Sequence, residues 1–296
     1  MKKWLKRLGV LLGVLVLAAA GLLAVAWWKS EQARARTYVV NDPPLTISRD
    51  AETLALGAHL FATRGCADCH GNDGAGKLVF DAGPVMKLIA PNITPGGVVK
   101  GYNADQIAAA IRHGVKPDGH PMLFMPAGDF KDFSDADTAA LVAHLQGLAK
   151  SSSDLGPTEV RPLGRVLYLF GKFPLLPAET IDHAPCTRSA PAVAATAEYG
   201  KYLAQGCTGC HGHDFAGQHV PGTPPEFKDA QNLTPANLGN WTREDFRRAL
   251  RTGKRPDGSA IDEFMPWRTF ANFKDEEIDA LWLYLHSLPP VATPKK

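Results

Sequence analysis

The sequence predicts an all-α protein in which two similar helical domains follow an N-terminal transmembrane helix. Three observations support this prediction: an uncharged N-terminal stretch, a set of short motifs that occurs twice in one order, and apolar residues at helical spacing. The chain has 296 residues, 45% hydrophobic and 21% charged, which is ordinary for a folded protein of roughly two small domains. Its formal net charge is only +2, and no basic stripe is interleaved with aromatic residues, so the sequence gives no support to nucleic-acid binding.

The N-terminal stretch has the length and the flanks of a membrane helix. Residues 8–28 contain no charged side chain, and at about 1.5 Å rise per residue they span roughly 30 Å, the thickness of a bilayer's hydrocarbon core. Trp27 and Trp28 lie where an interfacial aromatic belt would hold the outer end. Four basic residues precede the stretch and place the N-terminus in the cytoplasm: Lys2, Lys3, Lys6 and Arg7. We interpret residues 1–30 as a membrane anchor; the alternative is a cleaved signal peptide, because Ala-Val-Ala at 24–26 resembles a cleavage site.

Composition divides the rest of the chain into further segments. Residues 31–49 are charged and contain adjacent prolines, so we expect a tether, and residues 50–150 are expected to form the first globular domain. A run of three serines opens a linker at 151–194 that is punctuated by Pro and Gly, and residues 195–290 are expected to form the second domain. The linker contains Cys186, which is unpaired because the other four of the five cysteines belong to repeated motifs.

The two globular segments are copies of each other. Four short motifs occur twice in the same order, and all four are displaced by nearly the same distance along the chain. The first copies are Cys66-Ala67-Asp68-Cys69-His70, Asn92-Ile93-Thr94-Pro95, Pro117-Asp118-Gly119 and Phe124-Met125-Pro126. Their counterparts are Cys207-Thr208-Gly209-Cys210-His211, Asn232-Leu233-Thr234-Pro235, Pro256-Asp257-Gly258 and Phe264-Met265-Pro266. This pattern indicates a duplication, and two copies indicate two similar domains rather than a solenoid, which needs three or more units.

Each copy is expected to be a small helical bundle with long loops. Helices are predicted to begin at Asn103 and Thr242, because each residue can cap a helix and has Gln or Asp three positions on. They are predicted to end at Gly114 and Gly253, since glycine suits the position after a helix. The last helix of the second copy has an apolar stripe at helical spacing: Ile278, Leu281, Trp282, Leu285 and Leu288. No segment alternates convincingly as a β-strand, so no sheet is expected.

The repeated Cys-x-x-Cys-His motif is typical of covalent haem attachment. Two thiols at this spacing can form thioether bonds to the two vinyl groups of a porphyrin, and the adjacent histidine then becomes the proximal ligand of the iron. A zinc site would pair two Cys-x-x-Cys motifs within one domain, and a thioredoxin-like site would need a βαβ context; the sequence has neither pattern. We therefore predict two covalently bound haem c groups. The predicted attachment residues are Cys66, Cys69, Cys207 and Cys210, and the predicted proximal ligands are His70 and His211.

The candidates for the distal ligand are the methionines of the repeat. Met125 and Met265 stand in matching Phe-Met-Pro contexts, at almost the same distance along the chain from their proximal histidines. A thioether ligand favours reduced iron, so His/Met ligation raises the reduction potential. Met122 competes with Met125 in the first copy, and ligation of that iron by His113 or His120 is a further alternative.

The remaining histidines and methionines are expected to be structural or solvated. Met86 has no counterpart in the second copy and is expected to fill space in a core. His59 and His144 lie on predicted helices and are expected to be structural. The histidines near the motifs are expected to be solvated loop residues: His113, His120, His213 and His219.

The segment from Asn232 to Pro290 resembles the class I cytochrome c domains of cytochrome subunits from membrane quinoprotein and flavoprotein dehydrogenases. The resemblance rests on Asn-Leu-Thr-Pro, Pro-Asp-Gly and Phe-Met-Pro, followed by a helix with an acidic start that ends Tyr-Leu-His-Ser-Leu. It implies two tandem class I cytochrome c domains, with Met125 and Met265 as distal ligands. It also implies electron transfer from a partner subunit that oxidises a sugar, a sugar acid or an alcohol. Such subunits commonly carry three haems, whereas this chain has two haem motifs.

These observations lead to one functional hypothesis and two alternatives. We expect a dihaem c-type cytochrome that relays single electrons in the periplasm between a dehydrogenase and the respiratory chain, with no catalytic residues of its own. It would be held in the bacterial inner membrane by a single helix with a cytoplasmic N-terminus, and its partners would be a dehydrogenase, an oxidase or a soluble cytochrome. The alternatives are an accessory cytochrome arm of a terminal oxidase and a dihaem enzyme such as a peroxidase or sulfur-compound oxidoreductase. The latter needs an open iron position, whereas both copies offer a methionine.

The apolar linker segment 165–173 is expected to pack between the domains or, alternatively, to dock a partner.

Overall fold

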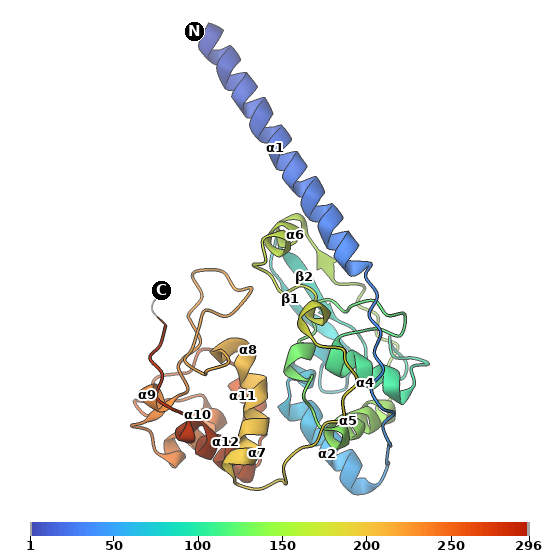
Figure 1. Cartoon of the computed structure of the whole chain (residues 1–296), viewed down its shortest axis with the longest axis vertical. Coiled ribbons are helices and arrows are strands. Elements are labelled where there is room, and N and C mark those ends of the chain that lie inside the picture. Colours follow the sequence, from blue (N-terminus) through green and yellow to red (C-terminus); the bar gives the residue numbers. More distant parts are fainter. Residues whose placement is uncertain (1, 295–296) are drawn as a thin grey trace.

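The structure, a computed structural model, describes residues 2–294 and is mostly helical. Its α-helices are α1 (Lys2–Arg34), α2 (Ala51–Thr63), α3 (Cys66–His70), α4 (Ala104–His113), α5 (Asp135–Gly147), α6 (Pro162–Leu169), α7 (Ala197–Ala204), α8 (Thr208–His211), α9 (Pro235–Leu238), α10 (Arg243–Thr252), α11 (Trp267–Phe270) and α12 (Asp275–Ser287). Short 3₁₀ helices are η1 (Ala127–Asp129), η2 (Pro177–Thr180) and η3 (Gln205–Cys207), and the strands are β1 (Lys77–Asp81), β2 (Met86–Ala90) and β3 (Glu159–Val160). Domain 1 contains α2–α5 and domain 2 contains α7–α12; the two lie side by side, with α1 projecting away from them (Figure 1). The predicted fold class is confirmed.

Helix α1 is long and apolar enough to cross a membrane, and most of its apolar part projects away from the domains, although Ala26 near its outer end is buried (Figure 1). The helix runs 33 residues to Arg34, so it continues beyond the predicted anchor and into the segment expected to be a tether. Its last turns are fixed on α6. Arg165 of α6 donates a hydrogen bond to Ser30 Oγ at 2.5 Å and pairs with Glu31 at 2.7 Å.

A small antiparallel sheet corrects the expectation that the chain has no strands. β1 pairs with β2, with Lys77 opposite Ala90, and β2 pairs with β3, with Met86 opposite Val160. Strand β2 is buried or half-buried on both faces, so it shows no alternation of apolar and polar residues. Its second partner is far away in sequence, a pairing that local periodicity cannot reveal.

The sheet and the linker form a core of their own beside domain 1. Met86 is fully buried there, which confirms its predicted packing role. Linker residues Phe173, Leu175 and Leu176 pack against it. The apolar linker segment therefore lies mainly on domain 1 and α1. Phe173 also approaches Gly222 of domain 2, which is the interdomain packing that the sequence led us to expect.

Each domain is organised around one close helix pair. In domain 1, α2 crosses α5 at Gly57, where an added Cβ would lie 2.1 Å from the carbonyl oxygen of Ala140. In domain 2, α7 crosses α12 at Gly200, where an added Cβ would lie 1.9 Å from the carbonyl oxygen of Ala280. Only glycine lets the backbones approach this closely. The predicted stripe of α12 is confirmed, since Ile278, Leu281, Trp282 and Leu285 are buried in the core of domain 2.

The predicted ends of the central helices are also confirmed. Asn103 and Thr242 each form a capping box with the residue three positions on, Gln106 and Asp245 respectively. Gly114 and Gly253 follow the last helical residues in the left-handed conformation, with φ of 62° and 67°. The local sequence signals were therefore sufficient to place α4 and α10.

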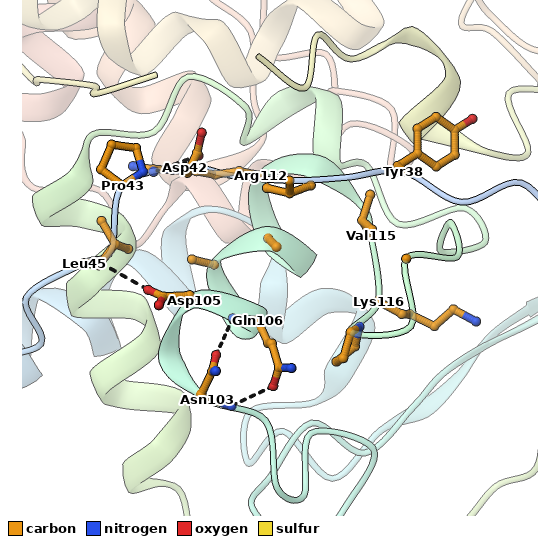
Figure 2. A pocket seen from close by; sticks show the side chains of 15 residues that line it. Tyr38, Asp42, Pro43, Leu45, Asn103, Asp105, Gln106, Arg112, Val115 and Lys116 are labelled. Atoms are coloured by element: carbon orange, nitrogen blue, oxygen red, sulfur yellow. Dashed lines mark hydrogen bonds and ion pairs between the residues drawn. The ribbon is translucent and has the colours of Figure 1, made fainter. Parts of the chain in front are cut away.

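The segment after α1 lies along α4 and is bound to domain 1 (Figure 2). The Leu45 N–H donates to the carboxylate of Asp105 at 3.2 Å, and the Tyr38 N–H donates to the carbonyl oxygen of Gly119 at 2.8 Å. A pocket of about 200 Å³ remains between this segment and α4. The segment between the membrane helix and domain 1 is therefore held in place over much of its length.

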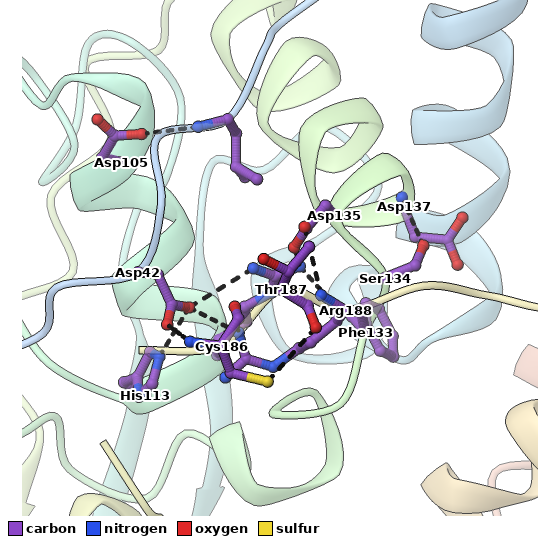
Figure 3. Close-up of polar contacts among 12 residues, drawn as sticks. Asp42, Asp105, His113, Phe133, Ser134, Asp135, Asp137, Cys186, Thr187 and Arg188 are labelled. Atoms are coloured by element: carbon purple, nitrogen blue, oxygen red, sulfur yellow. Dashed lines mark hydrogen bonds and ion pairs between the residues drawn. The ribbon is translucent and has the colours of Figure 1, made fainter. Parts of the chain in front are cut away.

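Asp42 connects this segment to the linker (Figure 3). Its carboxylate accepts hydrogen bonds from Arg188 at 2.7 Å, from the Cys186 N–H at 3.2 Å and from His113 Nε2 at 3.1 Å. His113 Nδ1 lies 3.0 Å from Nδ1 of His183. His113 is fully buried, so the expectation that it is a solvated loop residue was wrong. The burial comes from two segments, the tether and the linker, that are distant in sequence.

Candidate haem-binding sites

Domain 1 contains a large cavity beside its Cys-x-x-Cys-His motif. The cavity has a volume of about 920 Å³, at the upper end of the range for sites that hold small molecules and cofactors. Cys66, Cys69 and His70 line one part of it, and Met125 and Met122 line another. The structure therefore brings the predicted residues of the first site together around a space of cofactor size.

Both histidines of the motifs are oriented by a backbone carbonyl. His70 Nδ1 lies 2.8 Å from the carbonyl oxygen of Pro91, and His211 Nδ1 lies 2.7 Å from that of Gln231. Because a carbonyl can only accept, Nδ1 carries the proton in each ring. Burial lowers the pKa of both imidazoles, which keeps the rings neutral and leaves a lone pair on Nε2. This is the arrangement in which a histidine binds a metal through Nε2 while a second group fixes the ring.

The four motif cysteines are free thiols rather than disulfides. Burial raises the pKa of Cys66 and of Cys207 to about 12, so both thiols are protonated at neutral pH. A structural zinc site takes four ligands, and the described residues contain no group of three or more His, Cys, Asp or Glu side chains placed to hold a metal ion. The thiols therefore fit covalent attachment to a porphyrin better than direct binding of a metal.

The loop that carries the orienting carbonyl is built in the same way in both domains. Asn232 immediately follows Gln231, and its Oδ1 accepts from the N–H of Thr234 at 2.8 Å and from the Thr234 hydroxyl at 2.7 Å. Asn92 makes the same two bonds to Thr94, at 2.9 Å and 2.7 Å. Each Asn thus closes a tight turn just after the carbonyl that holds the histidine.

The same two asparagines also fasten the loop to the end of each domain. Asn92 Nδ2 donates to the carbonyl oxygen of Ser151 at 2.8 Å, and Asn232 Nδ2 donates to that of Val291 at 2.7 Å. Both side chains are buried. The sequence shows Asn-x-Thr-Pro as a repeat, and its positioning role becomes visible only in the structure. Its recurrence with the haem motif was the signal that could have identified these positioning residues.

The Met-Pro steps of the two methionine loops have matching backbone geometry. The carbonyl of Met125 accepts from the N–H of Ala127 at 2.7 Å, and that of Met265 accepts from the N–H of Trp267 at 2.7 Å. The intervening Pro126 has φ −77° and ψ 56°, and its counterpart in domain 2 has φ −78° and ψ 55°. The two Met-Pro steps are therefore structural as well as sequence equivalents, whereas Phe124 has a positive φ of 58° that its counterpart Phe264 does not share.

The histidine alternatives in domain 1 differ in their access to the cavity. His120 lines the cavity, and so does Met122. His113 does not line it, because its two ring nitrogens are directed to Asp42 and His183. The geometry thus removes His113 from the candidate ligands and keeps Met125, Met122 and His120 at the cavity wall.

These features define the class of protein. Two repeated helical domains each combine a Cys-x-x-Cys-His helix, a carbonyl that orients the histidine and a methionine loop, and this combination is that of a c-type cytochrome. The family model for cytochrome c matches residues 54–149 and residues 197–289. The chain belongs to the cytochrome c family, whose domains bind haem c covalently.

Curated proteins similar to this chain are cytochrome subunits of dehydrogenases. The cytochrome c subunit of alcohol dehydrogenase (quinone) from Gluconacetobacter polyoxogenes is 27% identical over 284 residues, which cover 83% of this chain and 58% of that protein. The gluconate 2-dehydrogenase cytochrome c subunit from Pantoea cypripedii is 33% identical over 269 residues, covering 78% of this chain and 58% of that protein. The fructose dehydrogenase cytochrome subunit from Gluconobacter japonicus is 33% identical over 128 residues, covering 40% of this chain and 26% of that protein. The chain thus spans 58% of the length of the first two relatives.

Proposed function

We propose that this chain is a two-haem c-type cytochrome that relays single electrons between a dehydrogenase and the respiratory chain. The observation that carries the proposal is the duplication of one site: a carbonyl-oriented imidazole beside two free thiols occurs in both domains. The dehydrogenase partner is supported by the relatives, which are named as cytochrome subunits of alcohol, gluconate and fructose dehydrogenases.

The residues of the first site have distinct roles in this proposal. Haem c, when bound, supplies an iron that takes up and gives up one electron. Cys66 and Cys69 would hold the group covalently, while His70 would bind the iron through Nε2 and the carbonyl of Pro91 would keep that ring in place. Met125 would bind the opposite side of the iron and exclude exogenous ligands. Cys207, Cys210, His211 and Met265 would have the same roles in domain 2.

The placement in the cell follows from α1. We propose that α1 crosses the bacterial inner membrane once with its N-terminus in the cytoplasm, because basic residues precede its apolar part. The domains, which we place at 50–150 and 195–290, would then lie in the periplasm, together with the connecting segments 31–49 and 151–194. Trp27 and Trp28 are both exposed at the outer end, where they suit the membrane interface.

The haem content of the full chain tests the proposal. The protein, produced in a host that exports it and attaches haem, should show two haem c per chain by the pyridine haemochrome assay and by intact mass. Cys66→Ser and Cys207→Ser should each leave one covalently attached haem. A protein without covalent haem would contradict the proposed function.

The distal ligands are tested by carbon monoxide. Met125→Ala and Met265→Ala should each lower the potential of one haem and create one reduced iron that binds carbon monoxide, since the thioether that favours reduced iron is removed. Met86→Ala removes a methionine of the sheet core and is the matched control; it should leave both irons unreactive. If the unmodified reduced protein binds carbon monoxide stoichiometrically, an iron is open and an enzyme becomes the better interpretation. If Met122→Ala, rather than Met125→Ala, opens the first iron, the ligand is Met122.

The partner is tested by purification from native membranes in mild detergent. We expect a dehydrogenase subunit to copurify and its substrate to reduce both haems. Copurification with a terminal oxidase alone would contradict the dehydrogenase partnership while leaving electron relay intact.

A further inference from the structure

The two haem motifs meet at the interface between the domains. Asp68, inside the first motif, accepts a hydrogen bond from the hydroxyl of Thr269 in α11 of domain 2. At the equivalent place in the other repeat, Gly209 lies inside the second motif, and an added Cβ there would be 3.1 Å from the carboxylate of Asp129 in η1 of domain 1. Thr269 and Asp129 occupy equivalent positions in the two repeats. Each haem motif therefore contacts the segment that follows the methionine loop of the other domain.

Two further polar contacts between the domains show the same reciprocal pattern, in which equivalent residues of the two repeats each contact the other domain. His59 Nε2 of domain 1 lies 2.8 Å from the carboxylate of Glu277 in domain 2, and the Tyr202 hydroxyl of domain 2 donates to Asp137 of domain 1. Glu277 and Asp137 are again equivalent positions, with the same displacement along the chain as Thr269 and Asp129. The two domains are thus related by an approximate twofold arrangement, with the haem motifs near its centre.

Arg64 lies at this centre and is held from both sides. Its guanidinium carbon is 5.6 Å from the ring centroid of Phe133 in domain 1 and 5.4 Å from that of Phe273 in domain 2. These two phenylalanines are equivalent positions as well. Arg64 Nε is buried and has no hydrogen-bond partner among residues 2–294. The aromatic rings rather than an acidic side chain therefore position the guanidinium, and its charge is not cancelled by a direct ion pair in that part of the chain.

The charge of Arg64 acts on both haem motifs. Burial raises the pKa of Cys66 and Cys207, and the positive charge of Arg64 opposes that rise at both thiols. The residue equivalent to Arg64 in domain 2 is Gln205, which is neutral. One cation, contributed by one repeat, thus faces the attachment sites of both.

We propose that Arg64 is an electrostatic positioning residue common to both haem sites, and that its charge raises the reduction potential of both haems. The proposal rests on the proposed function, because it requires a haem at each motif. Reduction adds one negative charge to the iron site, and a nearby fixed positive charge in a partly desolvated interface favours that state. Among the acidic side chains at the interface, Asp68 acts in the opposite direction at Cys66 and Asp129 does so at Cys207, while Glu277 is a third carboxylate within the electrostatic reach of Arg64.

The test is a redox titration of the full-length protein in detergent, followed by absorbance in the α-band. Arg64→Gln places in domain 1 the residue that domain 2 has, and it should lower the reduction equilibrium constant of both haems, each by up to about tenfold or about 59 mV. Arg64→Lys keeps the charge and should recover most of the difference. Arg49→Gln is the matched control, because Arg49 is exposed and hydrogen-bonds Gln146 at 2.9 Å; it should change neither potential. The Met125→Ala and Met265→Ala variants assign the two potentials to the two domains.

Several results would overturn the proposal. A shift confined to one haem would mean that the charge is not shared. Equal shifts in Arg64→Gln and Arg64→Lys would mean that packing, not charge, is responsible. If Arg64→Gln does not retain two haems, Arg64→Met is titrated instead. Methionine can still contact the Phe133 and Phe273 rings but has no charge, so it should lower both potentials in the same way. Two haems with unchanged potentials would refute the role of Arg64 while leaving the proposed function intact, and absence of haem from the unmodified protein would refute the proposed function itself.

Discussion

Asn232→Ala is predicted to lower the free energy of unfolding of domain 2 by about 3 kcal/mol. The side chain is 3% exposed and takes part in four hydrogen bonds, two accepted from Thr234 and one donated to each of Val291 and Thr293. The substitution leaves the Thr234 N–H and the Val291 carbonyl without these partners, and each such buried group costs about 1–3 kcal/mol. For a domain of this size, about 3 kcal/mol corresponds to a fall in Tm of about 12–24 °C.

The measurement is thermal unfolding of the haem-loaded protein, followed in the Soret region, where the loss of haem contacts in either domain changes the absorbance. Asn237→Ala is the matched control, because Asn237 is exposed and makes one side-chain hydrogen bond, to the Asn232 carbonyl at 2.8 Å; we expect a loss below about 1 kcal/mol. Asn92→Ala repeats the test in domain 1, where the bonds to Thr94, Ser151 and Ser153 are equivalent. A loss no larger for Asn232→Ala than for Asn237→Ala would refute the reasoning.

Three further predictions concern packing, pH and the iron-facing histidine. Gly200→Ala should prevent close contact of α7 with α12, because the added Cβ would meet the Ala280 carbonyl at 1.9 Å; proteolysis of domain 2 at lower temperature is the measurement. Burial raises the pKa of Asp129 to about 6. The cost of ionising this side chain in the folded protein is therefore absent below about pH 4, grows as the pH rises, and is complete above about pH 6. Asp129→Asn should therefore stabilise the protein at pH 8 by up to about 3 kcal/mol, with a gain that disappears at acid pH in denaturant titrations. His211→Ala should abolish the absorption spectrum of a six-coordinate second haem, and an unchanged spectrum would exclude it as a ligand.

Sequence reasoning was most successful where the signal was local. Helix α10 begins at a Thr242–Asp245 capping box and ends before Gly253, and both signals lie within the helix or next to it. The haem motifs were equally local, since Cys66, Cys69 and His70 form one short helix. The repeat then extended these inferences, because a pattern that occurs twice at one displacement is independent support for each copy.

Features made by distant segments were not predictable in this way. The burial of His113 depends on Asp42 and His183, which lie far away in sequence on either side. The position of Arg64 at the interface depends on Phe273, which belongs to the other repeat. In each case the residue type is compatible with an exposed loop, and only the packing of the whole chain gives it a defined environment.

The continuity of α1 has a consequence for where the first haem site would lie relative to the membrane. The helix ends at Arg34, and Glu31 and Arg34 border the large cavity of domain 1. With α1 in the bilayer, the first haem site would lie near the lipid surface. Helix α1 is continuous to Arg34 and its last turns are bonded to α6, so there is no flexible segment between the membrane helix and its contact with α6. A carrier dissolved in the membrane would therefore approach the first haem site from the lipid side.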